Sequence, residues 1–312
     1  MESFYLALSV VVPMLIYMLT GGIITRLGIF KPDQFRALNT MLFKVFIPLS
    51  LFFNVYSVDL RTVIVPDIFL FCALGVIVVL FLALFATRNL VKDRIDQATL
   101  VQGIYRSNFV LFGLTIAQSL CDEDGVALVS ALSAVVIPLF NMLAVILFEL
   151  SKGGKVKLKK LIISIFKNPL VDAGLIAGAL SLMRVHFPAL LESPLKTLGG
   201  IATPVALVAL GGILSFESVV AHRKLLVIGV LGRLVAVPCL MLAAGILMGF
   251  RGNELIAIMA VFGSPTAVAS APMAQAMGGN GDLAGEIVVM TSVFCLFSIF
   301  LYTFLMSSFG LI

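Results

Sequence analysis

The chain has 312 residues, of which 61% are hydrophobic and only 12% are charged, and its mean hydropathy is +1.17. A soluble domain usually carries about 25% charged residues, so this composition excludes an ordinary soluble protein and predicts a polytopic membrane protein. The formal charge is +5, and the basic residues lie in short loops between apolar runs, which argues against a nucleic-acid partner.

Ten apolar segments follow one another along the chain, each near the length of about 20 residues that crosses a bilayer as a helix. They are residues 4–25, 37–58, 67–87, 97–120, 126–149, 169–185, 193–216, 224–249, 254–277 and 284–309. The first segment opens without basic residues and is too long for the core of a signal peptide, so it reads as a spanning helix. We therefore predict an all-α protein with ten transmembrane helices.

Lysine and arginine are distributed unevenly between alternate loops. If the N-terminus lies outside, the inner loops hold fourteen of them: Arg26, Lys31, Arg36, Arg88, Lys92, Arg94, Lys152, Lys155, Lys157, Lys159, Lys160, Lys167, Arg223 and Lys224. The outer loops hold four: Arg61, Arg184, Lys196 and Arg251. The positive-inside rule then predicts both termini outside the cytoplasm, in the plasma (inner) membrane. The central loop 151–168 is cytoplasmic and serves as a topological anchor, with anionic lipid as a further candidate partner.

The two halves of the sequence share landmarks at a displacement of 156 or 157 residues. Pro13 coincides with Pro169 and Gly22 with Gly178. Residues 1–150 and 169–312 would thus form two five-helix repeats, and an odd number of spans inserts the second copy upside down. In transporters built this way, a pair of interrupted helices at matching positions marks the substrate site. Segments four and nine are such a pair.

Segment nine, "IMAVFGSPTAVASAPMAQAMGG", carries Pro265 and Pro272 in mid-span. Each proline removes a backbone hydrogen bond and costs about 3 kcal/mol in a helix interior. We predict helix breaks at Gly263, Pro265 and Pro272, with the freed backbone facing a protein-lined cavity, because it cannot face lipid. A helix that the prolines merely kink is the alternative.

Segment four has no proline but holds Arg106 and Asn108 in an apolar run. A mid-membrane arginine costs about 2.5–3.5 kcal/mol on insertion scales and needs a partner. If the two segments cross at their breaks, helix N-termini and the guanidinium would favour a carboxylate there. A structural ion pair of Arg106 with Asp172 or Glu286 is the alternative.

The candidate residues fall into two groups. The predicted substrate-binding residues are Asn54, Arg106, Asn108, Gly113, Thr115, Asn141, Ser264, Pro265, Thr266 and Ser270. The candidates for gating or ion coupling are Gln118, Asp172, Gln275 and Glu286. Asn54 and Asn141 serve equally well as hydrogen-bonding contacts between helices.

Both segments resemble motifs of the auxin efflux carrier family, which includes plant auxin carriers and bacterial malate or malonate permeases. In "RSNFVLFGLTIAQ" the matching residues are Asn108, Gly113, Leu114 and Ala117; in "SPTAVASAPMAQ" they are Pro265, Thr266, Ala267, Val268, Ala274 and Gln275. Thr115 stands where the family usually has a proline, and Ala269 where many members have a second asparagine. The first departure leaves open whether segment four is fully broken.

The resemblance implies a carrier of small organic anions, often a homodimer. In it a transport domain (segments 3–5 and 8–10) moves against a scaffold (segments 1, 2, 6 and 7). Our principal hypothesis is therefore a secondary transporter for a small carboxylate, with coupling to H⁺, Na⁺ or the membrane potential left open. The alternatives are an ion-coupled symporter or antiporter of another inverted-repeat family, or a ligand sensor. The sequence has no HExxH and no GxxxxGK[ST] loop, so we expect no enzyme, metal or cofactor.

Overall fold

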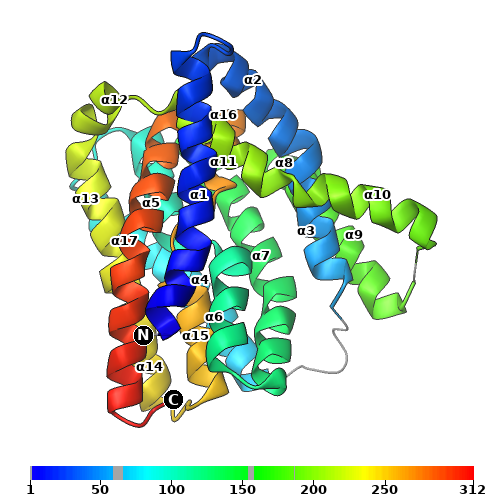
Figure 1. The fold of residues 1–312 in the computed structure, drawn as a ribbon, viewed down its shortest axis with the longest axis vertical. Coiled ribbons are helices and arrows are strands. Elements are labelled where there is room, and N and C mark those ends of the chain that lie inside the picture. Colours follow the sequence, from blue (N-terminus) through cyan, green and yellow to red (C-terminus); the bar gives the residue numbers. More distant parts are fainter. Residues whose placement is uncertain (1, 59–65, 154–157, 186) are drawn as a thin grey trace.

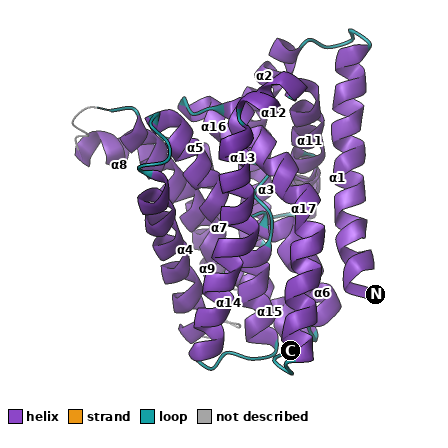
Figure 2. Cartoon of the chain, turned by 90° about the vertical axis from the view of Figure 1, so that its left-hand side faces the viewer, coloured by secondary structure: helices purple, strands orange, loops and turns teal. Residues whose placement is uncertain are grey.

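The computed structural model describes residues 2–58, 66–153, 158–185 and 187–312. Helices make up 83% of the chain, and no strand occurs within the described ranges. The helices run side by side in one bundle (Figures 1 and 2). Both chain ends lie at the same end of this bundle, and α8 lies near the opposite end (Figure 2).

The first half contains five helical runs. They are α1 (Glu2–Arg26); α2 (Pro32–Met41), the π-helical turn η1 (Leu42–Phe46) and α3 (Ile47–Tyr56) as one rod; α4 (Pro66–Thr87); the interrupted run of α5 (Arg94–Tyr105), the π-helical turn η2 (Phe109–Gly113) and α6 (Leu114–Leu120); and α7 (Glu123–Ser151).

The second half contains five corresponding runs and two short helices, α8 (Leu158–Phe166) and α12 (Phe216–Ala221). The runs are α9 (Pro169–Met183); α10 (Ala189–Gly200) with α11 (Ala202–Ile213); α13 (Arg223–Leu231) with the π-helical turn η3 (Gly232–Ala236) and α14 (Val237–Leu247); α15 (Asn253–Gly263) and α16 (Ser270–Met277), which are separated by a break; and α17 (Gly281–Ser308).

Six of these runs are long and apolar enough to cross a membrane: Pro32–Tyr56, Pro66–Thr87, Glu123–Ser151, Ala189–Ile213, Arg223–Leu247 and Gly281–Ser308. Four shorter apolar helices accompany them: Val12–Arg26, Leu111–Leu120, Pro169–Met183 and Asn253–Gly263. The architecture is that of an all-helical, polytopic membrane protein. That all ten segments span the bilayer, as two inverted repeats, stays a prediction.

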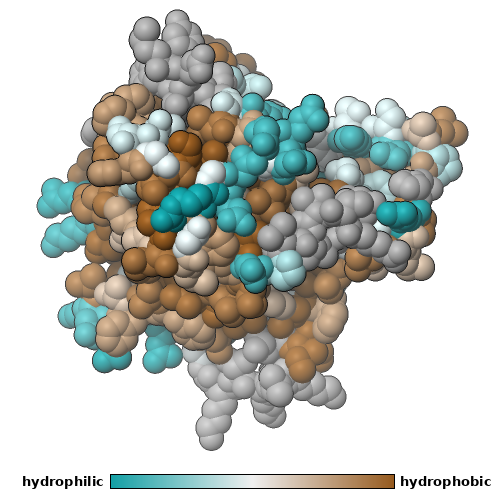
Figure 3. All heavy atoms as spheres, turned by 90° about the horizontal axis from the view of Figure 1, so that it is seen from below, coloured by the Kyte–Doolittle hydropathy of each residue, from teal (hydrophilic) through white to brown (hydrophobic). Residues whose placement is uncertain are grey.

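The outer surface of the bundle is apolar, as lipid contact requires. Large hydrophobic side chains such as Phe85, Leu190 and Leu247 are exposed. Seen from the end where the termini lie, the described surface is largely hydrophobic, with hydrophilic residues in separate groups (Figure 3). An aqueous solvent would penalise so much exposed apolar area, whereas hydrocarbon chains would not.

Polar side chains at the bundle ends fix where helices begin. The Asp93 carboxylate accepts hydrogen bonds from the first turn of α5, and Asn280 caps α17 in the same way. Asp122 caps α7 by accepting from the Gly125 N–H, and it also accepts from the Asn253 amide at 2.6 Å. These hydrogen bonds hold the pKa of the Asp122 carboxyl below its ordinary value.

The predicted cytoplasmic loop 151–168 differs from expectation, because α8 occupies Leu158–Phe166. Residues 154–157 of that loop, including Lys155 and Lys157, lie outside the described residues. Ile162, Ile163 and Phe166 are exposed on the helix. A charged stretch followed by an apolar one thus forms a short helix rather than an irregular loop, which fits a segment resting on a membrane surface.

The helices α1 and α11 approach each other closely. A Cβ atom on Gly21 would overlap the backbone of Val208, and one on Gly211 would overlap the backbone of Met18. The hydroxyl of Thr25 donates to the Gly212 carbonyl at 2.9 Å across the same contact. Small residues therefore set the spacing of these two helices, as is common in membranes.

Candidate functional site

Segment four is interrupted at residues 106–108, without a proline. α5 ends at Tyr105, Arg106 is extended (φ −89°, ψ 115°), and the helix resumes at Phe109. The break therefore precedes Thr115, the position at which the related motif carries proline. Thr115 itself lies in α6 and donates its hydroxyl to the Leu111 carbonyl at 2.6 Å.

Segment nine is interrupted at residues 264–269. Gly263 is the last residue of α15, Ser264 is extended (φ −65°, ψ 150°), and α16 begins at Ser270. Pro265 lies inside this extended stretch. Pro272 does not interrupt a helix, since it is the third residue of α16. Backbone N–H groups in a first turn have no intrahelical acceptor, so a proline is tolerated there.

The two interruptions cross and pair through their backbones. The Asn108 N–H donates to the Pro265 carbonyl at 2.7 Å, and the Ala267 N–H donates to the Arg106 carbonyl at 3.2 Å. Ser107 and Thr266 form an isolated antiparallel bridge between these contacts. Each extended stretch thus satisfies backbone groups of the other, which makes the breaks tolerable at membrane depth.

Side chains reinforce this crossing. The Thr266 hydroxyl donates to the Gly103 carbonyl of α5 at 2.7 Å, and the Thr266 N–H donates to the Thr291 hydroxyl of α17 at 3.1 Å. The Ser264 hydroxyl donates to the Ala260 carbonyl at 2.5 Å. Ser264 and Thr266, both predicted as substrate ligands, are fully buried with their hydroxyls engaged inside the protein.

Arg233 of η3 stabilises the helix ends that the breaks expose. Its guanidinium is fully buried and donates only to backbone carbonyls. These acceptors are Ile104 (3.0 Å) and Tyr105 (3.2 Å) of α5, and Val261 (3.1 Å), Phe262 (2.9 Å) and Ser264 (2.7 Å) on the α15 side. Helix C-termini carry partial negative charge and unpaired carbonyls. One arginine therefore neutralises two helix ends at once.

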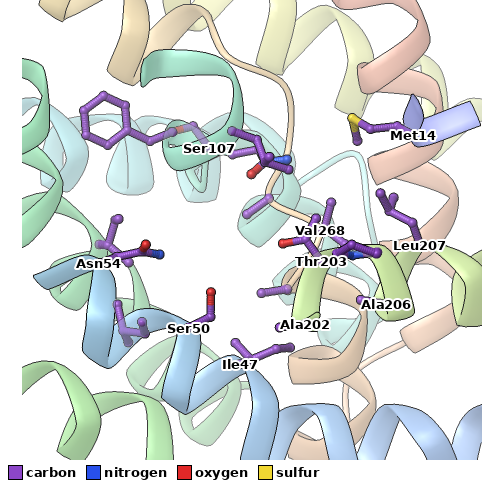
Figure 4. A pocket seen from close by; sticks show the side chains of 18 of the residues that line it. Met14, Ile47, Ser50, Asn54, Ser107, Ala202, Thr203, Ala206, Leu207 and Val268 are labelled. Atoms are coloured by element: carbon purple, nitrogen blue, oxygen red, sulfur yellow. The ribbon is translucent and has the colours of Figure 1, made fainter. Parts of the chain in front are cut away.

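A cavity of about 510 Å³ lies beside the crossing. The lining comes from α1, α3, the 106–108 stretch, η2, α6, α7, the α10–α11 junction, α11 and the 267–269 stretch. Ser50 of α3 and Ser107 lie on opposite sides of the hollow (Figure 4). The polar residues in the lining are Tyr17, Ser50, Asn54, Arg106, Ser107, Asn108, Thr115, Asn141 and Thr203.

Arg106 is a positive charge in the wall of this cavity. Its side chain is 4% exposed, and it donates to the Asn141 Oδ1 atom and to the Met273 Sδ atom, each at 2.7 Å. Neither partner is charged, and Arg106 forms no ion pair with a described residue. Asp172 and Glu286, the acidic partners considered from the sequence, lie elsewhere. The guanidinium thus retains an uncompensated charge beside an empty volume.

Two further polar groups of the wall have no partner. The Ser107 Oγ and Asn108 Nδ2 atoms are buried and form no hydrogen bond within the described structure. Leaving a buried donor unsatisfied costs about 1–3 kcal/mol. A ligand with acceptor oxygens would remove this cost, and the N-termini of η2 and α16 at the same place also favour negative charge.

The predicted residues therefore divide into two sets. The structure brings Asn54, Arg106, Asn108, Thr115 and Asn141 together in the cavity lining. Gly113, Ser264, Pro265, Thr266 and Ser270 are not in that lining. Gly113 packs against the Phe109 ring, and the Ser270 hydroxyl is buried without a partner.

The gating and coupling candidates are dispersed. Gln118 is exposed on α6, and Asp172 is half-buried near the start of α9. Gln275 accepts from the Asn39 amide at 3.1 Å and donates to the Arg36 carbonyl at 2.8 Å, so it connects α16 to α2. Glu286 is buried in α17 beside a second cavity of about 290 Å³.

Sequence reasoning overlooked several residues of this region. Ser107, Ser50 and Thr203 line the cavity but carry no distinctive pattern. Arg233 is not among the predicted residues, although a second arginine in mid-span is a usable signal, because such residues are costly unless they have partners inside the protein.

Comparison with known proteins decides the family. A family model described as membrane transport protein, the model of the auxin efflux carriers, matches residues 6–303. The chain belongs to the auxin efflux carrier family. The resemblance noted in segments four and nine is thereby confirmed, and membership identifies the chain as a membrane transport protein. A search of curated proteins finds no match to the chain.

Proposed function

We propose that this protein is a secondary transporter that carries a small organic anion through the cavity at the crossing of segments four and nine. The proposal rests on the unpaired positive charge in the wall of this cavity. Arg106 is buried, positively charged and without an acidic partner among the described residues. An anion that enters the cavity would supply the missing counter-charge.

A carboxylate fits this wall better than a larger or more highly charged anion. A guanidinium offers parallel N–H groups that match the two oxygens of a carboxylate. Ser107 and Asn108 supply further donors, and most of the remaining lining is apolar. A volume of about 510 Å³ lies within the range of about 300–1,000 Å³ that is usual for small-molecule sites.

The surroundings of the cavity support alternating access. Pro13, Met14 and Leu51 line it from the predicted scaffold, and Asn108, Phe140 and Val268 from the predicted transport domain. In our proposal the two groups move relative to each other in an inverted-repeat carrier of ten spans, with both termini outside the plasma membrane and a homodimer as the assembly. Moving one net charge across 100 mV involves about 2.3 kcal/mol, so the membrane potential alone could expel an anion.

The first test is binding of a panel of small carboxylates to the purified protein in detergent. For the carboxylate that binds, we expect Arg106→Gln to weaken affinity about tenfold to a hundredfold, since hydrogen bonds to charged groups contribute about 1.5–3 kcal/mol. Arg106→Lys keeps the positive charge but loses the parallel N–H groups of the guanidinium, so its affinity should be intermediate. Asn108→Ala should weaken binding by a smaller factor.

Arg88→Gln is the matched control, because it removes an exposed arginine at the end of α4, a helix that contributes no residue to the cavity lining. Its affinity should equal that of the unmodified protein. Unchanged binding in both Arg106→Gln and Asn108→Ala would show that the site is elsewhere. Exchange of the bound carboxylate across proteoliposome membranes then distinguishes the two functions, because a transporter exchanges it and a ligand sensor only binds it.

A further inference from the structure

The second cavity contains an acid–base pair that the anion site does not use. Glu286 is 1% exposed and is the only buried acidic residue among those described. Its Oε1 atom accepts a hydrogen bond from the Ser218 hydroxyl, and its Oε2 atom lies 2.8 Å from the His222 Nδ1 atom. Ser218 belongs to α12 and His222 directly follows it, whereas Glu286 belongs to α17.

We propose that Glu286, His222 and Ser218 form a proton-binding site. With a neutral imidazole, the Nδ1–H donates to the carboxylate and the pair carries one negative charge. A proton taken from water onto the Nε2 atom gives an imidazolium beside the carboxylate, and the net charge becomes zero. A buried carboxylate is costly without such a partner, and histidine is the side chain that changes charge most readily near neutral pH.

Among the charged groups around the second cavity, the Glu286–His222 pair is the one that we expect to change its charge with pH. The same cavity is lined by Arg36 of α2 and Asp282 of α17, which pair with each other at 3.2 Å. α11 and α16 contribute no ionisable side chain to its lining. The other charged groups on elements packed against α17 near its start are Arg26, Arg94, Asp96, Glu217, Arg223 and Lys224. Asp96 bonds to Asn280, and none of these six forms a hydrogen bond with Glu286 in the described structure.

A proton suits the site better than a sodium ion. Both carboxylate oxygens already face a hydroxyl or a ring nitrogen, whereas a hard cation requires several oxygen ligands. No group of three or more His, Cys, Asp or Glu side chains with metal-binding geometry occurs in the described part of the chain.

The position of the pair links it to the transport cycle, and this role rests on the proposed function. α12 connects α11 of the predicted scaffold to α13 of the predicted transport domain. α11 lines both cavities, with Ala206 at the first and Leu210 at the second. Ala269, which directly precedes α16, lines the first cavity, and Ala271 of α16 lines the second. A proton that strengthens the contact between α12 and α17 would therefore bias the relative position of the two groups of helices.

Histidine NMR tests the site without any carboxylate. The chain contains two histidines, so ring-labelled protein should give two signals that His222→Gln assigns. We expect the pH midpoint of the His222 signal to fall in Glu286→Gln, because the negative charge that favours the imidazolium is gone. Asp172→Asn, which removes a half-buried acidic residue outside both cavities, should leave the midpoint unchanged.

An unchanged His222 midpoint in Glu286→Gln, or no titration at all, would overturn the proposal. A shift of the His222 signal on adding Na⁺ at constant pH would also overturn it, in favour of a metal cation. In proteoliposomes, carboxylate exchange by the unmodified protein should depend on pH, and Glu286→Gln should abolish that dependence. Because the NMR experiment uses no anion, its failure is distinct from failure of the proposed anion site, which would appear as unchanged carboxylate binding in Arg106→Gln and Asn108→Ala.

Discussion

Two buried arginines lie within the same crossing, but their hydrogen bonding differs completely. Every N–H group of the Arg233 guanidinium is matched by a backbone carbonyl. Arg106 has only the Asn141 amide oxygen and the Met273 sulfur as partners, and it borders an open volume. A saturated guanidinium stabilises the fold, whereas an unsaturated one at a cavity is available to a ligand.

This difference predicts opposite effects on stability and binding. Arg233→Met should lower the thermal stability of the purified protein severely, because each carbonyl left buried without a donor costs about 1–3 kcal/mol. Arg233→Lys should be intermediate, since an ammonium has three donors instead of five. Size-exclusion chromatography after heating shows how much of each variant stays monodisperse, and this gives the order of their thermal stabilities.

Arg106→Gln is the informative comparison, since it removes a charge from the same region. It should leave thermal stability close to that of the unmodified protein while it weakens carboxylate binding. If Arg233→Met were as stable as Arg233→Lys, the carbonyl contacts would contribute nothing, and the structural assignment of Arg233 would be wrong.

At the scale of elements, the two interruptions have different origins. Proline and small residues around Pro265 identified the break in segment nine from sequence, because proline disrupts a helix locally. The break at 106–108 has no such local cause. It depends on tertiary contacts with the Pro265 and Ala267 backbone and with Arg233, which a single stretch of sequence does not encode.

Other features of the elements also escaped sequence reasoning for physical reasons. Apolar periodicity places helices but does not distinguish an α-helical from a π-helical turn, so η1 and η3 were not foreseen. Pro272 carries the same local signal as Pro265, yet it falls in a first turn where proline is compatible with a helix. Polar residues in apolar runs did locate five of the nine polar residues in the cavity lining, because burying such groups requires partners inside the protein.

The crossing itself can be tested at Thr266, which holds α5 through its hydroxyl. Thr266→Val keeps the shape of the side chain but leaves the Gly103 carbonyl without its 2.7 Å donor. We expect a loss of about 1–3 kcal/mol in unfolding free energy and a clear fall in melting temperature. Thr266→Ser restores the hydroxyl and should recover most of the stability.

Pro265→Ala provides the contrast. If the tertiary contacts hold the extended stretch, this variant should lose little stability and keep carboxylate binding, although it removes the proline. A larger loss in Pro265→Ala than in Thr266→Val would show that local backbone preference, not pairing between the segments, maintains the break.

At the scale of the whole molecule, the two cavities occupy opposite halves of one interface. α11 lines both cavities, and polar contacts close the half that is farther from the chain termini. The Asn39 amide donates to the Gln275 Oε1 atom at 3.1 Å, and Arg36 pairs with Asp282. The ion pair is substantially exposed, so it contributes little by itself and can separate when the two groups of helices move.

Covalent restraint of this contact should therefore stop transport without stopping binding. In a background lacking the native cysteines Cys72, Cys121, Cys239 and Cys295, Asn39→Cys with Gln275→Cys places two thiols across the interface. A short bifunctional reagent should abolish carboxylate exchange in proteoliposomes, and a reducible linker should allow recovery on reduction. The anion cavity lies in the other half, so binding should persist.

Thr87→Cys with Gln97→Cys is the matched control, because these side chains are also in contact, at 3.2 Å, but both belong to the predicted transport domain. Linking them restrains no movement between the two groups of helices and should leave exchange intact. If the Asn39–Gln275 link left exchange intact as well, the two groups would not separate at this end during transport, and movement of segments 3–5 and 8–10 as one body against segments 1, 2, 6 and 7 would have to be abandoned.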